Sequence, residues 1–234
     1  MDIYSEDTIQ RVSLVDYAVE RLRRDLLTGE IEPGERIRVT KLEKRFGVSH
    51  IPIREALQRL EAEGFVKTKP QHGTVAAGVD LEDLHGLYDV RRLIEGQVVH
   101  RAVLAASDEE LETLRASLDA LEEATATVEA PLFWQRHREF HWALLEPGAN
   151  PWISRVLRQT WLAAERYVRL FVSETFEVAM REHRALVAAA EARDAALAQR
   201  LLIAHLDRTE RTVREGFGEH AASLSEVASR ESSA

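Results

Sequence analysis

The sequence predicts a mainly α-helical protein in two parts: a small N-terminal part of three helices and a β-hairpin, and a larger all-α bundle of antiparallel helices. Two observations support this fold class. Residues 1–76 alternate short amphipathic runs with Gly and Pro breaks and end in two runs typical of strands. After a short linker at 77–80, apolar residues recur at helical spacing through 81–220. A Ser-, Ala- and Glu-rich tail at 221–234 is predicted to be disordered.

The three N-terminal helices have recognisable ends. Ser13 is a cap candidate for the first helix, which runs toward a Gly break. Thr40 stands three residues before Glu43, a capping-box pattern that predicts the start of a short second helix. Gly47 ends that helix, and Ser49 can cap the third. This order predicts a helix-turn-helix.

A candidate hairpin follows the third helix, which stops at Gly64. Residues 65–69 and 74–76 have the composition of short strands, and Pro70 and Gly73 lie in the turn between them. A helix-turn-helix followed by such a hairpin is a winged helix-turn-helix. The whole of 1–76 is therefore interpreted as one winged domain.

The C-terminal part is predicted to be helical throughout. Ser107 and Glu110 form another capping-box pattern, and the segment from Pro147 to Pro151 is the strongest internal break. Gly86 is a candidate break within the first helix. The expected helices cover roughly 81–105, 108–126, 131–146, 150–173, 175–192 and 194–218.

The charge is distributed unevenly along the 234 residues. The net charge is −9, yet residues 1–78 hold 13 Lys and Arg against 13 Asp and Glu, so the acidic excess lies entirely in 79–234. Within the first part, residues 36–72 hold nine basic and four acidic side chains, a possible footprint for phosphate groups. The absence of cysteine, of a signal-peptide pattern and of a spanning apolar run predicts a cytoplasmic protein with no membrane partner.

The third helix is the candidate DNA reader. Its N-terminal residues face away from Leu57 and Leu60, as in a recognition helix that enters the major groove of double-stranded DNA. The wing can contact phosphate or a minor groove. The alternative is a plain three-helix domain that binds protein. The predicted DNA contacts are Ser49, His50, Ile51 and Arg54 on this helix, Thr40 and Lys41 before it, and His72 and Gly73 at the wing tip.

The motif Gly47-Val-Ser-x-x-Pro-Ile-Arg-Glu-Ala-Leu-x-x-Leu-Glu-x-Glu-Gly64, with Gly29-x-x-x-Pro-Gly34 upstream, resembles the signature of the GntR superfamily of transcriptional regulators. The resemblance implies a homodimer on a pseudo-palindromic operator, with Arg54 in contact with DNA. Many relatives carry Arg where this chain has His50 and Thr or Ser where it has Ile51. Loss of a bidentate guanine reader alters the operator code, so the usual operator is not expected.

Four histidines in the C-terminal part form a candidate metal site. His137 and His141 are spaced i,i+4 and therefore share one face of one helix, while His183 and His205 lie on later helices. Such side chains can converge in the core of a bundle, and imidazole suits zinc, nickel, copper or iron. The alternative is a set of exposed or core histidines with no common site.

The runs Phe140-His141-x-x-Leu144, Glu182-His183-x-x-Leu186 and Ala204-His205-Leu resemble the FCD ligand-binding domain of FadR-like regulators. Many members bind a divalent metal, such as zinc or nickel, through one Asp and three His. Here His137 stands at the Asp position, which leaves either a four-histidine site or a lost ligand. Without the carboxylate the site is more positive, which favours an anionic effector, and a small organic acid is expected.

The early bundle helix carries Arg91 and Arg92, and it resembles the family's effector-binding helix. Either guanidinium can clamp a carboxylate bidentately, and the alternative is an Arg–Glu surface pair. The predicted function is therefore an effector-controlled, DNA-binding transcriptional regulator and not an enzyme. The rivals are a metal-dependent enzyme that uses the histidine cluster and a scaffold or toxin-type interaction module.

Overall fold

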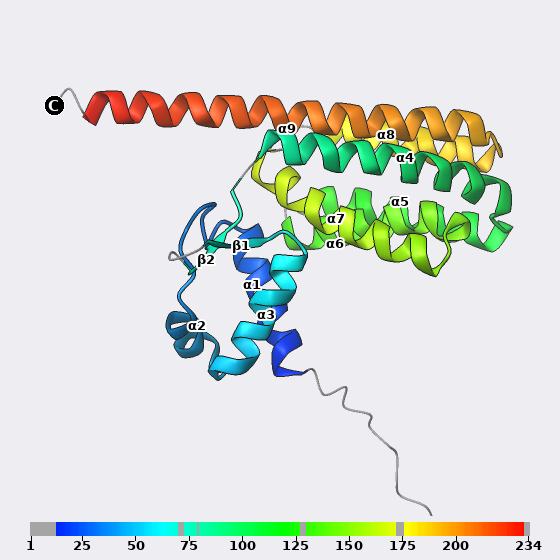
Figure 1. The fold of residues 1–234 in the computed structure, drawn as a ribbon. Helices are drawn as coiled ribbons and strands as arrows, with labels where there is room; N and C mark the ends of the chain where they lie inside the picture. Colours follow the sequence, from blue (N-terminus) through cyan, green and yellow to red (C-terminus); the bar gives the residue numbers. More distant parts are fainter. Residues whose placement is uncertain (1–12, 70–72, 79, 127–129, 172–175, 232–234) are drawn as a thin grey trace, which may run out of the picture. The chain divides into compact units, whose positions relative to one another are not determined.

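The computed structural model describes residues 13–69, 73–78, 80–126, 130–171 and 176–231, drawn in colour in Figure 1. The chain divides into two compact units, Met1–Val79 and Asp80–Ala234. Unit 1 contains α1 (Leu14–Leu27), α2 (Val39–Phe46), α3 (His50–Ala62), β1 (Val66–Lys69) and β2 (Gly73–Ala76).

Unit 1 is a winged helix-turn-helix, as predicted. Helix α3 packs against α1 and α2, and the antiparallel strands pair in the register from Val66 with Ala76 to Lys69 with Gly73. Gly47 ends α2 with φ of 67°, a left-handed conformation that glycine adopts without steric cost and that reverses the chain toward α3. The small core is closed by side chains that share one face of each helix, including Ala18, Leu22, Ile53, Ala56 and Leu60.

The capping predictions have mixed outcomes. Ser13 accepts a hydrogen bond from the Asp16 amide at 3.0 Å, which confirms the first cap. The prediction for Thr40 is wrong, because α2 already begins at Val39 and its N-cap residue makes no side-chain cap. Burial of Leu42 and Phe46 accounts for that register better than capping does. Ser49 holds the N-cap position of α3 but also makes no side-chain hydrogen bond there.

Unit 2 is an all-helical bundle, which confirms the predicted fold class (Figure 1). Helix α9 lies along α4 and α8, α5 packs against α6 and α8, and α7 packs against α4 and α9. The elements are α4 (Leu81–Ala105), α5 (Asp108–Ala126), α6 (Ala130–Leu145), the 3-10 turn η1 (Glu146–Gly148), α7 (Pro151–Phe171), α8 (Phe176–Glu191) and α9 (Ala195–Glu231).

Local chemistry sets the helix ends of unit 2. The capping box between Ser107 and Glu110 forms in both directions, with N···O distances of 2.6 and 3.2 Å. The break at 147–151 places Gly148 so close to α4 that an added Cβ would lie 2.3 Å from the Val98 carbonyl oxygen. Only glycine therefore permits this approach of η1 to α4.

Two expectations for unit 2 differ from the structure. Helix α4 runs unbroken past Gly86, and the burial of Leu84 and Tyr88 offsets the roughly 1 kcal/mol that an interior glycine costs. Helix α9 continues to Glu231 instead of giving way to a disordered tail from 221. No Gly or Pro interrupts 221–231, so the sequence there carries no helix-ending signal. Across the described residues, no helix combines the length and apolar character needed to cross a membrane.

Candidate functional site

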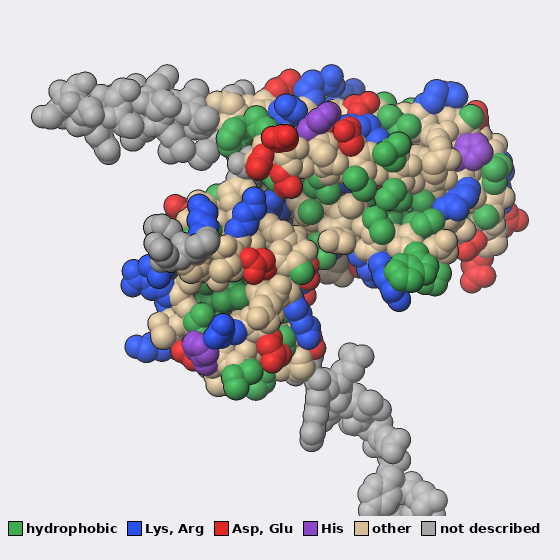
Figure 2. All heavy atoms as spheres, in the orientation of Figure 1, with side chains coloured by type: hydrophobic (Ala, Val, Ile, Leu, Met, Phe, Trp, Pro, Cys, Tyr) green, Lys and Arg blue, Asp and Glu red, His purple; other side chains and the backbone are tan. Residues whose placement is uncertain are grey.

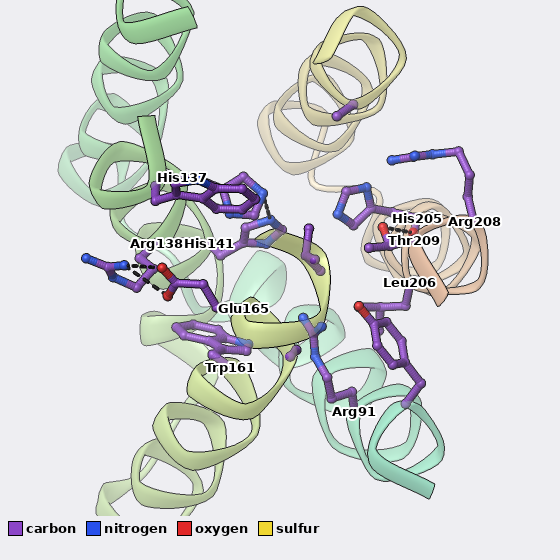
Figure 3. A pocket seen from close by; sticks show the side chains of 15 residues that line it. Arg91, His137, Arg138, His141, Trp161, Glu165, His205, Leu206, Arg208 and Thr209 are labelled. Atoms are coloured by element: carbon purple, nitrogen blue, oxygen red, sulfur yellow. Dashed lines mark hydrogen bonds and ion pairs between the residues drawn. The ribbon is translucent and has the colours of Figure 1, made fainter. Parts of the chain in front are cut away.

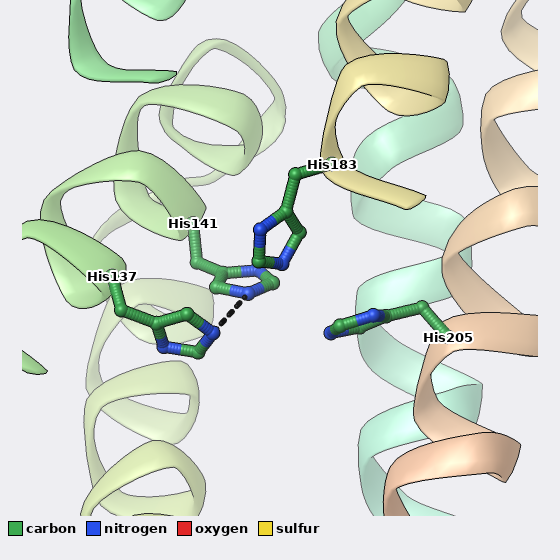
Figure 4. A group of neighbouring side chains, drawn as sticks. All are labelled: His137, His141, His183 and His205. Carbon is green, nitrogen blue, oxygen red and sulfur yellow. Dashed lines mark hydrogen bonds between the residues drawn. The ribbon is translucent and has the colours of Figure 1, made fainter. Parts of the chain in front are cut away.

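The four predicted metal ligands meet in the interior of unit 2 (Figure 4). His137 and His141 project from one face of α6, His183 comes from α8 and His205 from α9. Each ring supplies one nitrogen, and these four atoms all lie within 4.8 Å of one another. The Nε2 atoms of His137 and His141 are 3.2 Å apart. The cluster predicted from i,i+4 spacing and later histidines is therefore assembled.

His183 shows that these residues fit a metal ion. Its side chain is fully buried, and neither ring nitrogen has a hydrogen-bond partner among the described residues. The buried Nδ1 of His141 also lacks a partner there. Unpaired buried polar atoms cost free energy, which a coordinate bond at this place would offset. Zinc–nitrogen bonds of about 2.0–2.1 Å in a tetrahedral site put the nitrogens about 3.3 Å apart, so only small movements are required.

His205 is held by a second layer of charged groups. Its Nδ1 lies 2.7 Å from a carboxylate oxygen of Glu182, and Arg208 donates two hydrogen bonds to the same carboxylate at 2.6 and 2.7 Å. A carboxylate that accepts from one ring nitrogen fixes the imidazole and directs the other nitrogen to the metal. His205 is thus positioned to offer Nε2 to the cluster (Figure 4).

The environment keeps the histidines neutral, which is the form that binds metals. Burial and the neighbouring cations lower the pKa of His137 to about 3, and burial with neighbouring histidines lowers the pKa values of His141 and His183 well below their ordinary value. Burial alone raises the pKa of Glu182, but hydrogen bonds from His205 and Arg208 outweigh it and hold that pKa at about 2. The ligand set therefore carries no charge of its own.

A cavity of about 80 Å³ adjoins the histidines (Figure 3). On the scale by which one water needs about 10–15 Å³, it has room for several waters or for a small organic molecule. His137, His141 and His205 form one part of its wall. The apolar part of the wall is made by Tyr88, Trp134, Trp161, Ala164, Val168, Ala179 and Leu206.

Arg91 reaches this cavity from α4, whereas Arg92 does not (Figure 3). Arg91 is buried and donates from Nε to Glu95 at 2.6 Å, and Glu95 also accepts from Trp161 at 3.0 Å. This is a buried pair and not the surface Arg–Glu pair considered as the alternative. Arg92 instead bonds to three carboxylates at the α4–α9 surface, those of Asp89, Asp207 and Glu210.

Other charged residues at the cavity were not predicted as site residues from the sequence. Arg138 donates twice to the buried Glu165 at 2.8 and 2.9 Å, and Arg169 donates to Glu165 as well. Together with the pairs of Arg91 and Arg208, four arginines are paired with three glutamates, so these ion pairs carry one excess positive charge. The arginines are Arg91, Arg138, Arg169 and Arg208, and the glutamates are Glu95, Glu165 and Glu182. The sequence contained only a weak indication of these residues: Arg138 directly follows a proposed ligand histidine, and Glu182 directly precedes another.

The predicted DNA contacts lie on the surface of unit 1. Ser49, at the N-cap position of α3, is exposed, as are His50, Ile51 and Arg54 on the helix, while the opposite face of the helix is buried. Figure 2 shows Lys and Arg side chains over α2 and the strands of this unit. Thr40 and Lys41 are exposed on α2, and Gly73 begins β2 with the guanidinium of Arg36 beside it. His72 lies outside the described residues.

An exposed helix-turn-helix with a wing, joined to a helical unit with a buried polar cavity, defines a class of two-domain transcriptional regulators. Residues 14–75 match the family described as bacterial regulatory proteins, gntR family, and residues 86–208 match the FCD domain. The chain belongs to the GntR family and has an FCD domain, as the sequence resemblance predicted.

Relatives of similar length carry the same class of name. The chain is 34% identical to the HTH-type transcriptional regulator BphR of Paraburkholderia xenovorans (strain LB400), over 88% of this chain and 87% of the relative. It is 30% identical to the HTH-type transcriptional repressor GlaR of Escherichia coli (strain K12), over 79% of this chain and 89% of that protein. The solved structure of E. coli McbR/YncC has the same fold, with a TM-score of 0.74 at 21% identity over 88% of this chain and 99% of that one.

These relatives are transcriptional regulators rather than enzymes. The chain is accordingly a DNA-binding transcriptional regulator of the GntR type, and the metal-dependent enzyme is rejected. The family match to the winged unit likewise rejects a scaffold with an idle first domain.

Proposed function

We propose that this regulator binds its operator as a homodimer in the cytoplasm and that a small carboxylate, bound beside a divalent metal in unit 2, controls the affinity. The observation that carries the proposal is His183, whose two buried ring nitrogens lack partners in the middle of the histidine cluster. A core histidine without a ligand would be expected to have at least one hydrogen bond.

The proposed ligands are His137, His141, His183 and His205, with zinc, nickel or a similar divalent ion. The ion carries two positive charges, and the four imidazoles are neutral, so the ligands do not change the charge of the site. His137 replaces the carboxylate that many relatives carry at this position, and its side chain lines the cavity. The residues of this chain thus hold the ion and leave its charge to be balanced by an anion on the cavity side.

The effector is proposed to be a small organic acid. The charged groups around the cavity already hold one excess positive charge, and a metal ion adds to it. Arg91 uses Nε and Nη2 for Glu95, which leaves Nη1 for a ligand carboxylate. The aromatic walls, Trp134 and Trp161, suit an apolar body behind that carboxylate. Arg92, engaged by three acids outside the cavity, is not proposed as an effector ligand.

DNA recognition is assigned to the exposed start of α3. Arg54 projects from a rigid helix whose other face is anchored by Ile53, Ala56 and Leu57, so a base contact would be well oriented. Ser49, His50 and Ile51 are proposed to lie in the groove beside it. Thr40, Lys41 and the wing residues at 72–73 are proposed to contact the sugar-phosphate backbone, which sets position rather than sequence preference.

Arg54→Ala should weaken binding to the operator by about 1–3 kcal/mol, roughly 5- to 150-fold, if the guanidinium contacts a base. The probe is double-stranded DNA selected by the wild-type protein from a random pool, titrated by fluorescence anisotropy at fixed salt. Arg115→Ala is the matched control, because it removes one exposed positive charge from α5 of unit 2. Equal affinities of Arg54→Ala and wild type would remove Arg54 from the recognition surface.

A further inference from the structure

The carboxylate of Asp83, in the first turn of α4, lies between two side chains of α7. The hydroxyl of Tyr167 donates to its Oδ2 at 2.6 Å, and Nη2 of Arg166 lies 3.9 Å from the same oxygen. The Tyr167 hydroxyl is also 3.5 Å from the carbonyl oxygen of Asp80, the N-cap residue of α4. Tyr167 therefore ties the start of α4 to α7, and Arg166 stands beside the same carboxylate as a second partner.

Arg166 lacks the full set of contacts that a buried guanidinium requires. The residue is 7% exposed, and its buried Nη1 has no hydrogen-bond partner among the described residues. Its guanidinium stacks on the ring of Tyr167, 4.5 Å from the centroid. An unpaired buried donor costs free energy, which an ion pair with Asp83 would offset.

Asp83 accordingly has two arrangements of comparable quality. In the arrangement of the structure, the Tyr167 hydroxyl is bonded and a nitrogen of Arg166 is unpaired. A small movement of the first turn of α4 would give Arg166 its ion pair and leave the buried hydroxyl unpaired instead. Each arrangement leaves one buried polar group without a partner, so a modest bias can decide between them.

The turn of α7 that carries these two partners also forms part of the cavity wall. Ala164 and Glu165 directly precede Arg166, Val168 directly follows Tyr167, and all three line the cavity (Figure 3). Neither Arg166 nor Tyr167 is itself among the lining residues. A molecule that packs against this wall therefore acts on the turn that holds Asp83 without touching the carboxylate.

Helix α4 connects Asp83 to both ends of the regulatory path. Arg91 lines the cavity from the same helix, eight residues or about 12 Å along the axis from Asp83. In the other direction, Asp80 is the first residue of unit 2 and directly follows the segment that joins it to unit 1. A change in the first turn of α4 is thus passed to the connection with the DNA-binding unit through the chain itself.

We propose that the exchange of Asp83 between Tyr167 and Arg166 positions the first turn of α4 and thereby sets the operator affinity. This inference rests on the proposed function, in which a small acid in the cavity shifts the balance. Tyr167 and Arg166 are positioning residues, since they act through α4. Coupling between two sites requires such a two-state element, whose balance each site can bias.

Tyr167→Phe leaves Asp83 to Arg166, whereas Arg166→Met leaves it to Tyr167. The two variants should therefore shift the operator dissociation constant in opposite directions without added acid, each by about 2- to 30-fold. The measurement is fluorescence anisotropy at fixed salt with operator DNA selected by the wild-type protein. Asp83→Asn keeps an acceptor for Tyr167 and removes the charge that attracts Arg166, so it should shift affinity in the same direction as Arg166→Met.

Two features of this set exclude simpler explanations. Arg166→Met and Asp83→Asn change the net charge in opposite senses, so a common direction cannot come from altered attraction to DNA. Glu82→Gln is the control, because it removes the neighbouring exposed carboxylate from the same turn, and its operator affinity should stay at the wild-type value. Each acid that raises the melting temperature of metal-loaded wild type should still do so in the variants, while its effect on operator affinity shrinks.

Circular dichroism and the melting temperature show which variants fold. Shifts in the same direction by Tyr167→Phe and Arg166→Met, or no shift in folded variants, overturn the switch, and the proposed function stands if wild type still responds to an acid. If Tyr167→Phe does not fold, opposite shifts by Arg166→Met and Asp83→Asn overturn the switch. A wild type that responds to no acid overturns the proposed function, whereas opposite shifts by Tyr167→Phe and Arg166→Met would still support Asp83 as a determinant of operator affinity.

Discussion

His183→Leu should abolish the stabilisation of the protein by zinc or nickel while leaving the metal-free protein at least as stable as wild type. Leucine fills a similar volume and removes two buried ring nitrogens that have no partner among the described residues. In the wild type, metal at 100 to 1,000 times its dissociation constant should raise the melting temperature by roughly 5–15 °C. In the variant this shift should disappear.

The measurement is differential scanning fluorimetry of untagged, chelator-treated protein with and without added metal, together with metal analysis by mass spectrometry. His85→Leu is the control, because His85 belongs to the same unit but lies exposed on α4 outside the cluster. A full metal complement in His183→Leu would show that the cluster is not the site. An unstable metal-free variant would show that His183 stabilises the core in another way.

Arg91→Ala should destabilise unit 2 by about 3–5 kcal/mol, because it leaves the carboxylate of Glu95 buried without its cation. Trp161 alone, with one neutral donor at 3.0 Å, does not compensate for that charge. Chemical denaturation followed by tryptophan fluorescence gives the free energy of unfolding. A loss below about 1 kcal/mol would mean that the pair is hydrated rather than buried.

The double variant Arg91→Met/Glu95→Gln separates folding from effector binding. Methionine replaces the arginine stem, and glutamine keeps an acceptor for the Trp161 indole, so most of the lost stability should return. The carboxylate response should not return, because the cation is absent. If both the stability and the carboxylate response returned, the effector would have to contact residues other than Arg91.

The sequence predicted most of the fold because helix ends and burial patterns are local. The capping box of Ser107 and Glu110 and the break at Pro147 predicted helix ends, and the structure has helix ends at both places. The prediction that Thr40 begins the second helix was wrong because capping is only one contribution to where a helix starts. Burial of Leu42 and Phe46 accounts for the position of this helix. Burial likewise explains why α4 continues unbroken past Gly86: Leu84 and Tyr88 are buried on the other face of this helix.

The candidate site was predictable where it depends on spacing along one helix. His137 and His141 face the same way because they are i,i+4, and Arg91 meets Glu95 for the same reason. The pair between Arg138 and Glu165 joins residues 27 positions apart on different helices, and such pairs follow from helix packing. No local pattern reveals this pair or the one between Arg208 and Glu182, and the excess positive charge counted at the cavity depends on both.

The central claim is that a small carboxylate at the metal site controls operator affinity. Its most direct test is titration of operator DNA with metal-loaded protein, with and without each small carboxylate or sugar acid that raises the melting temperature. We expect at least one such acid to change the operator dissociation constant by about 5- to 150-fold, equivalent to a coupling of about 1–3 kcal/mol. The change should vanish on metal removal and in Arg91→Met/Glu95→Gln. If only neutral or cationic ligands act, or if the response survives both changes, the account is contradicted.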